Sequence, residues 1–156
     1  MFKTIVLGLD GSPDAERAVP YAVDLAGDSG RIVAVYVREI VFSRAGAHTA
    51  VPNEDEVESA VSKQVDDLAA KGVKIELKMA TSVAGGPGQA LADAAEVEHA
   101  DVIVVGTRGY SQIAGLLVGS VTQRLLHVAH CPVLAVPRSA AASATDTPSE
   151  SAAAAT

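Results

Sequence analysis

Cysteine and aromatic residues are scarce in this sequence. Cys131 is the single cysteine, and Phe, Tyr and Trp together make up 3% of the 156 residues. One thiol cannot form an intramolecular disulfide or a multi-thiolate metal site, which is typical of a reducing compartment, and we interpret Cys131 as a small buried residue. With so few aromatic side chains, the core must be built from Val, Ala, Leu and Ile, which favours a sheet buried on both faces.

Long apolar runs and basic clusters are missing as well. No apolar stretch approaches the ~20 residues of a membrane-spanning helix, and Asp10 ends the apolar segment 1–9 before it could serve as the core of a signal peptide. The 12 Lys and Arg residues are scattered, and the formal net charge of −7 repels polyanions. These features predict a cytoplasmic protein that binds neither nucleic acid nor membranes.

Short apolar runs predict β-strands, and segments of helical periodicity lie between them. The runs cover residues 4–9, 31–37, 73–79, 101–105 and 132–136. Lys74, Glu76 and Lys78 leave one face of the third run polar, so we place this strand at an edge. The alternation of strands and helices predicts one doubly wound α/β domain. We expect a five-stranded parallel sheet in the order 3-2-1-4-5, with helices on both faces.

This domain is expected to occupy residues 1–138. From 139 to 156 nearly every residue is Ala, Ser, Thr, Pro or acidic, and the lack of large apolar side chains predicts a disordered Ala/Ser-rich tail. Within the domain, the connection from Arg38 to Pro52 is longer than an ordinary loop, and we expect it to form a mobile flap over the binding edge of the sheet.

Capping residues predict where two helices begin. Ser12 precedes Pro13, which suits the first helical position, so Ser12 is the expected N-cap of the first helix. Ser120 and Gln123 have the spacing of a capping box, which predicts that Ser120 caps the fourth helix.

A glycine-rich segment connects the fourth strand to the fourth helix. Gly106-Thr107-Arg108-Gly109 follows the strand, and Gly119-Ser120-Val121-Thr122 opens the helix. Glycines allow the backbone to approach a ligand closely, the N–H groups of a helix start lack partners, and the hydroxyls of Ser120 and Thr122 can add donors. The sequence therefore predicts a phosphate-binding loop over 106–122, although neither a Walker loop nor a dinucleotide fingerprint occurs.

The spacing G-x2-G-x9-G-S, from Gly106 to Ser120, resembles the nucleotide loop of ATP-binding universal stress proteins. Three further segments are similar to motifs of that family: Gly8-Leu9-Asp10-Gly11-Ser12 after the first strand, Gly85-Gly86-Pro87 before the third helix, and the last strand, Pro132 to Val136. The resemblance covers roughly residues 1–138. It implies an adenine-nucleotide-binding protein that uses ATP and Mg²⁺ and forms a homodimer through the last strand.

The resemblance also implies a set of nucleotide-binding residues. Phosphates would lie on the loop and helix start, Asp10 near the ribose or a phosphate-bound Mg²⁺, and Gly8 and Leu9 in the turn beside it. Val37 would offer backbone hydrogen bonds to adenine, and Val105 would help to line the pocket. The phosphate-binding residues implied are Gly106, Gly109, Gly119, Ser120, Val121 and Thr122. Arg108 either pairs with phosphate oxygens or points to solvent.

Three classes of function are compatible with this fold. The first is a stress-response module regulated by its bound nucleotide, which we favour. The second is an enzyme that uses ATP, but the chain lacks an SGGxDS-type loop and an HxGH pair, so only slow ATPase activity remains open. The third is a phosphoacceptor domain, which would need an Asp where the chain has Ala80-Thr81-Ser82. His127 and His130, three residues apart, are interpreted as structural rather than as metal ligands.

Overall fold

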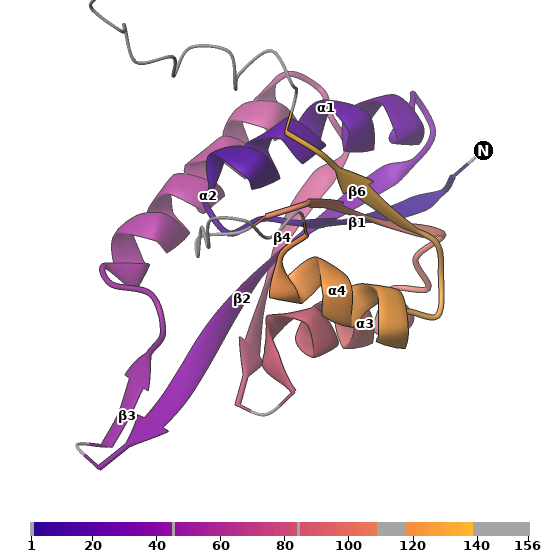
Figure 1. Ribbon diagram of the computed structural model, residues 1–156. Coiled ribbons are helices and arrows are strands. Elements are labelled where there is room, and N and C mark those ends of the chain that lie inside the picture. Colours follow the sequence, from indigo (N-terminus) through magenta and orange to yellow (C-terminus); the bar gives the residue numbers. More distant parts are fainter. Residues whose placement is uncertain (1, 45, 84, 109–117, 139–156) are drawn as a thin grey trace, which may run out of the picture.

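A parallel sheet with β1 at its centre forms the middle layer of the computed structural model (Figure 1). The structure describes residues 2–44, 46–83, 85–108 and 118–138. The parallel strands are β1 (Thr4–Gly8), β2 (Arg31–Ser43), β4 (Ile75–Ser82), β5 (Val102–Gly106) and β6 (Val133–Val136). β2 and β5 flank β1, β4 pairs with β2, and β6 pairs with β5. The predicted order 3-2-1-4-5 is therefore confirmed for these five strands.

Helices cover both faces of this sheet, as expected for a doubly wound fold. α1 (Pro13–Ala26) and α2 (Glu54–Ala70) lie on one face, and α3 (Gly86–Val97) and α4 (Ser120–Val128) lie on the other (Figure 1). Side chains of β1 alternate between the two cores: Ile5 and Leu7 pack below α1 and α2, whereas Val6 packs against α3 and α4. The cap prediction for α1 is confirmed, since the Ser12 hydroxyl accepts a hydrogen bond from Ala15 N (3.2 Å).

The predicted flap from Arg38 to Pro52 is instead largely a β-hairpin. β2 does not end at Val37 but continues to Ser43, and the chain returns antiparallel as β3 (Gly46–Thr49). The hairpin projects from the carboxyl end of the sheet (Figure 1). Ile40, Val41 and Phe42 are residue types that favour strands, and this local preference extends β2 beyond the buried run that the prediction used.

Helix α4 begins at the predicted residue, but its cap differs. Gly119 is the N-cap, in an extended conformation (φ −72°, ψ 162°), and Ser120 is already helical. The predicted capping box is therefore wrong. The Gln123 side chain donates to Val118 O (3.2 Å) instead of reaching back to a serine cap. Leu125 is buried against the sheet, while Val121 and Val128 are half-buried on the same core.

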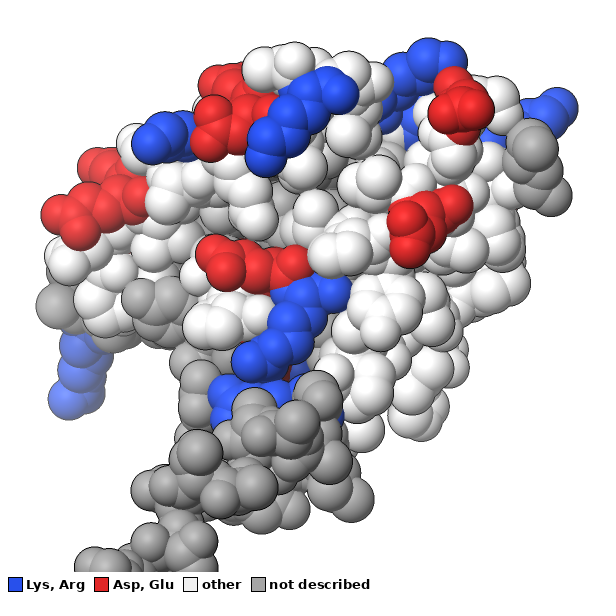
Figure 2. All heavy atoms as spheres, turned by 90° about the horizontal axis from the view of Figure 1, so that it is seen from above, with Lys and Arg blue, Asp and Glu red and all other residues white. Residues whose placement is uncertain are grey.

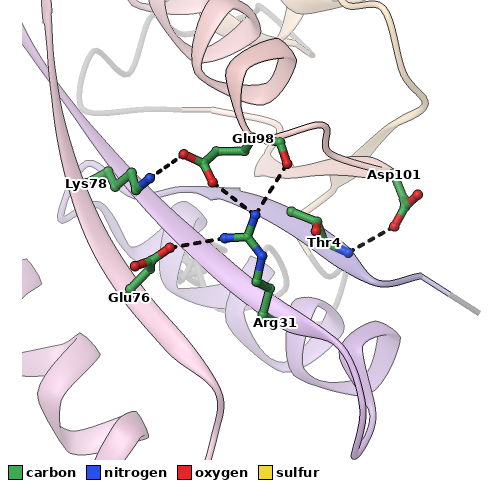
Figure 3. Close-up of polar contacts among 6 residues, drawn as sticks. All are labelled: Thr4, Arg31, Glu76, Lys78, Glu98 and Asp101. Carbon is green, nitrogen blue, oxygen red and sulfur yellow. Dashed lines mark hydrogen bonds and ion pairs between the residues drawn. The ribbon is translucent and has the colours of Figure 1, made fainter.

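Ion pairs hold the edge strand β4 to β2 and to the end of α3 (Figure 3). Arg31 donates to Glu76 (3.1 Å) and to Glu98 (3.0 Å), and Lys78 also pairs with Glu98. The Lys78 hydrogen bond, with help from Arg31, holds the pKa of Glu98 below its ordinary value. Exposed Glu76 and Lys78 alternate with half-buried Ile75 and Leu77, which confirms that this strand has one polar face.

Asp101 fixes the start of β1. Its Oδ2 accepts hydrogen bonds from the N–H groups of Lys3 (2.6 Å) and Thr4 (2.9 Å), and the second of these is drawn in Figure 3. These main-chain donors, Thr4 foremost, hold the pKa of Asp101 below its ordinary value. The carboxylate thus joins the loop before β5 to the first strand of the sheet.

Acidic and basic side chains are interleaved on the face formed by α1 and α2 (Figure 2).

Cys131 is half-buried against the core between the sheet and the helices α3 and α4, and burial raises the pKa of its thiol. No helix among the described residues has the length and apolar character needed to cross a membrane. The predicted tail, 139–156, lies outside the described residues.

Candidate functional site

β1 ends earlier than its neighbour β2 at the carboxyl edge of the sheet. Gly8, the last residue of β1, is paired with Val35, and the Leu9 N–H makes one further bond to the Val35 carbonyl (3.0 Å). β2 continues for eight more residues, to Ser43. The main chain of Val37 therefore lies beyond the last contact between the two strands.

The direction of the Val37 main chain follows from bonds made at the start of β2. The Arg31 N–H donates toward β1, to Lys3 O (2.9 Å), whereas the Ile32 N–H donates toward β4, to Lys74 O (2.7 Å). This pattern repeats every two residues, so odd-numbered residues of β2 face β1 and even-numbered residues face β4. The N–H and C=O of Val37 thus point to the side where β1 has ended. They form a donor and acceptor pair at the carboxyl edge.

Apolar side chains line this edge on the α3 and α4 face. Val105 is buried and Val37 is half-buried, and both pack on the core of that face. A Cβ added to Gly8 would lie 2.9 Å from side-chain atoms of both Leu91 and Val105, so these side chains fill the space above Gly8. Leu9 is buried in the opposite core, and its side chain points away from this surface.

Asp10 directly follows these residues and is half-buried. Its Oδ1 accepts a 2.9 Å hydrogen bond from Ser12 N, which fixes the turn between β1 and α1. This turn also needs Gly11, whose φ of +75° lies in the left-handed region and whose missing Cβ leaves room for Val57. The structure therefore places the Asp10 carboxylate at the carboxyl edge; contact with ribose or Mg²⁺ remains a prediction.

Helix α4 presents main-chain N–H groups at the same edge. The Gln123 N–H is the first to bond within the helix, to Gly119 O (3.0 Å). The N–H groups of Ser120, Val121 and Thr122 precede it, so they have no carbonyl acceptor within α4. A helix start of this kind attracts anions, because three donors and the positive end of the helix dipole coincide.

Thr122 and Gly106 have structural roles that the sequence motif did not indicate. Thr122 is buried, and its hydroxyl donates to Gly106 O (3.0 Å). The expectation that this hydroxyl would serve as an outward donor is therefore wrong, and only the main chain of Thr122 remains for a ligand. A Cβ on Gly106 would lie 2.6 Å from the carbonyl carbon of Asp14, so glycine is required here for β5 to approach α1.

The two ends of the glycine-rich loop are bonded to each other. Gly119 N donates to Thr107 O (2.6 Å), and Thr107 N donates to Val136 O (3.0 Å), which joins the loop to β6. Arg108 is half-buried, and both alternatives for its side chain remain predictions. Gly109 and the residues up to 117 lie outside the described part of the chain.

A buried polar cluster beside Val37 was missed by the sequence analysis. The Tyr36 hydroxyl donates to Glu54 Oε1 (3.1 Å), and Arg38 Nε lies 3.7 Å from the same oxygen. Arg38 also pairs with Glu58, one turn later in α2. In the sequence, Glu54 is the first of three consecutive acidic residues, 54–56. No local pattern connects it with a tyrosine 18 residues earlier.

The described residues also include a groove on the α1 and α2 face and two histidine contacts. A groove of about 400 Å³ separates α1 from α2, with Val19, Val61 and Leu68 among the residues that line it. In the described ranges, no three His, Cys, Asp or Glu side chains gather as a metal site. His127 Nδ1 lies 2.7 Å from Gln123 O, and His130 Nε2 lies 3.7 Å from a Glu96 oxygen.

Comparison with known proteins agrees with this architecture. The family model described as the universal stress protein family matches residues 1–137. A universal stress protein of Thermus aquaticus is 36% identical over 142 residues, covering 87% of this chain and 99% of the relative. One from Methanocaldococcus jannaschii is 31% identical over 143 residues, covering 87% and 82%.

Solved structures give the same result. A universal stress protein crystallised in complex with cAMP superposes with a TM-score of 0.66 and 27% identity, covering 88% of this chain and 99% of the other. The chain therefore belongs to the universal stress protein family.

Proposed function

We propose that this protein is a stress-response module that binds an adenine nucleotide at the carboxyl edge of its sheet and acts through the bound state. The observation that carries the proposal is the pairing of two main-chain sites on one edge. The Val37 N–H and C=O match the acceptor and donor on the Watson–Crick edge of adenine, and the N–H groups of Ser120, Val121 and Thr122 suit phosphate oxygens. A relative crystallised with cAMP supports an adenine nucleotide as the ligand.

In this proposal, ATP binds with Mg²⁺. Asp10 supplies a carboxylate next to the phosphates, Gly119 allows a phosphate to approach the start of α4, and Val105 and Val37 contact the base. Gly106 and Gly8 contribute mainly by leaving room for the backbones and side chains around them. Arg108 and Gly109 complete the phosphate loop.

We infer a binding role rather than catalysis. The Asp10 carboxylate at this edge accepts the Ser12 N–H that fixes the turn. A general base needs a free position beside the attacking water, and one oxygen of Asp10 is already used in this turn. Slow ATP hydrolysis is tested by measuring phosphate release over hours.

The expected homodimer is also part of the proposal. β6 pairs only with β5 among the described strands, so its other edge is open to a second copy. Val133, Leu134 and Ala135 are each half-buried in the single chain, which leaves part of their apolar surface for such pairing.

Thermal unfolding with added ligands tests the proposed function. ATP with Mg²⁺ should raise the melting temperature, and at ~100 times the dissociation constant the stabilisation is about 2.7 kcal/mol. Gly119→Val should weaken ATP binding at least about tenfold by placing bulk where a phosphate approaches. The φ of −72° at Gly119 suits any residue, so the variant should keep the fold. If ATP, GTP and cAMP all leave the melting temperature unchanged, the proposal is wrong.

A further inference from the structure

One carboxylate holds β2 on both sides of Val37. Tyr36 and Arg38 are even-numbered neighbours of Val37, so their side chains lie on the α1 and α2 face, opposite to that of Val37. The Tyr36 hydroxyl and Arg38 Nε both approach Glu54 Oε1, at 3.1 and 3.7 Å. The segment 36–38 is thus tied to the first residue of α2.

This cluster lies in the protein interior. Tyr36 is 2% exposed and Glu54 is 6% exposed. Burial, with the nearby Glu54 carboxylate, raises the pKa of the Tyr36 phenol, so the phenol stays protonated and donates. Glu54 opens α2, where the helix dipole favours a negative charge, and Arg38 reaches one turn further to Glu58. The hydrogen bond from Tyr36 to Glu54 is charge-assisted and therefore geometrically restrictive, whereas Arg38 Nε makes an ion-pair contact with Glu54.

On one side of β2, the Val37 main chain lies between two partners: Leu9 N reaches Val35 O (3.0 Å), and Ala50 N, after β3, reaches Glu39 O (3.0 Å). β4 pairs with β2 on the other side, at Ala80 opposite Val37, but β1 has already ended. Among the described residues, no main-chain bond joins the N–H or C=O of Val37 to a partner on this side, so residues 36–38 depend on the side-chain contacts of Tyr36 and Arg38. Rotation or displacement of residues 36–38 would misdirect both groups.

We propose that Glu54 is a positioning residue for base recognition, which acts by holding Tyr36 and Arg38 so that the Val37 main chain faces the base. This inference rests on the proposed function and deepens it. Glu54 touches neither base nor phosphate. Its loss should therefore reduce discrimination between bases more than it reduces affinity for the phosphate chain.

Binding of three ligands, measured by calorimetry on the full chain, separates these effects. ATP and GTP differ only in the base, and tripolyphosphate has no base. The variants are Glu54→Ala, which removes both contacts; Glu54→Gln, which keeps an acceptor for the Tyr36 hydroxyl; and Tyr36→Phe, which removes the donor alone. Glu56→Gln is the matched control, since Glu56 is an exposed acid in the same helical turn.

We expect Glu54→Ala to lower the ratio of ATP affinity to GTP affinity by about tenfold, with a change of less than about threefold for tripolyphosphate. Tyr36→Phe should also lower the ratio of ATP affinity to GTP affinity, and Glu54→Gln should lower it less than Glu54→Ala does. Glu56→Gln should have the wild-type ratio. If Glu54→Ala does not fold, Tyr36→Phe and Glu54→Gln decide the question, because both preserve side-chain volume.

Two results would overturn the inference. If the variants are less stable but keep the wild-type ratio, Glu54 has a structural role alone, while the proposed function stands. If wild type binds ATP and GTP equally, the base is not read by Val37 and nothing is left for Glu54 to position. Failure of the proposed function is seen separately, as absence of any nucleotide binding by wild type.

Discussion

The hydroxyl of Thr122, in the first turn of α4, donates a hydrogen bond to the carbonyl of Gly106, the last residue of β5, and both residues are buried. Together with the bond from Gly119 N to Thr107 O, this contact fixes the two ends of the glycine-rich loop against each other. Part of a motif associated with ligand binding therefore maintains the fold.

Thr122→Val tests this bond. Valine keeps the shape of threonine but removes the donor, which leaves the buried Gly106 carbonyl without this partner. We expect the free energy of unfolding in urea to fall by about 1–3 kcal/mol. Thr122→Ser is the control, because it keeps the hydroxyl, and it should lose less. Equal stability of Thr122→Val and wild type would contradict a role for the bond.

A side chain added at Gly106 should destabilise the fold much more than a side chain added at Gly119. Gly106→Ala places a Cβ against backbone atoms of Asp14, which cannot move independently of α1. A loss of about 1–3 kcal/mol in unfolding free energy is expected. Gly119→Ser should cost little, since Ser12 caps α1 with nearly the same angles (φ −80°, ψ 152°). Denaturation curves of both variants decide this, and the reverse order of stability would refute the assignment.

Asp101 should make stability depend on pH. Its folded-state pKa is lower than the ordinary value of 3.8, so the stabilisation is present above about pH 4 and is lost as pH falls through the folded pKa. Asp101→Asn removes this contribution. The variant should therefore be less stable than wild type at pH 7, and the difference should narrow at pH 3. The urea midpoints of wild type and Asp101→Asn at pH 7 and pH 3 provide the measurement. If the two proteins differ in stability by the same amount at both pH values, the pH dependence does not come from this carboxyl group.

Dimerisation through β6 is tested by Val133→Lys. A lysine at the first residue of β6 adds an unpaired charge to the proposed strand pair, so sedimentation at micromolar concentration should show a monomer. Val97→Lys is the control, because Val97 is 75% exposed on α3 and away from β6. Circular dichroism checks that both variants fold. If wild type is a monomer, the proposed dimer is wrong. If Val133→Lys is still a dimer, the interface does not depend on β6.

Most of the fold was predictable because buried strands and amphipathic helices leave periodic signals. The runs 31–37 and 101–105 gave the central strands, and the polar face of the third run correctly predicted an edge. The hairpin was missed because Ile40 to Phe42 are exposed or half-buried, and an analysis of buried runs passes over them.

The candidate site was predictable only in part. Glycine spacing and family resemblance indicated the loop, but could not distinguish Gly106, which is needed for packing against Asp14, from Gly119, which has an ordinary φ. The Thr122 hydroxyl was expected to donate to a bound anion because its acceptor in the fold, Gly106 O, is 16 residues away in the sequence. The link from Tyr36 to Glu54 likewise depends on how β2 and α2 pack, which local sequence does not encode.

The early end of β1 also affects how the protein tolerates sequence variation. In the proposed site, the donor and acceptor at position 37 are main-chain atoms, so any side chain compatible with a strand leaves them in place. Related proteins can therefore differ at this position and still present the same hydrogen-bonding edge. Changes in ligand preference during divergence should arise instead from residues that shift the strand, and these are buried side chains on its opposite face.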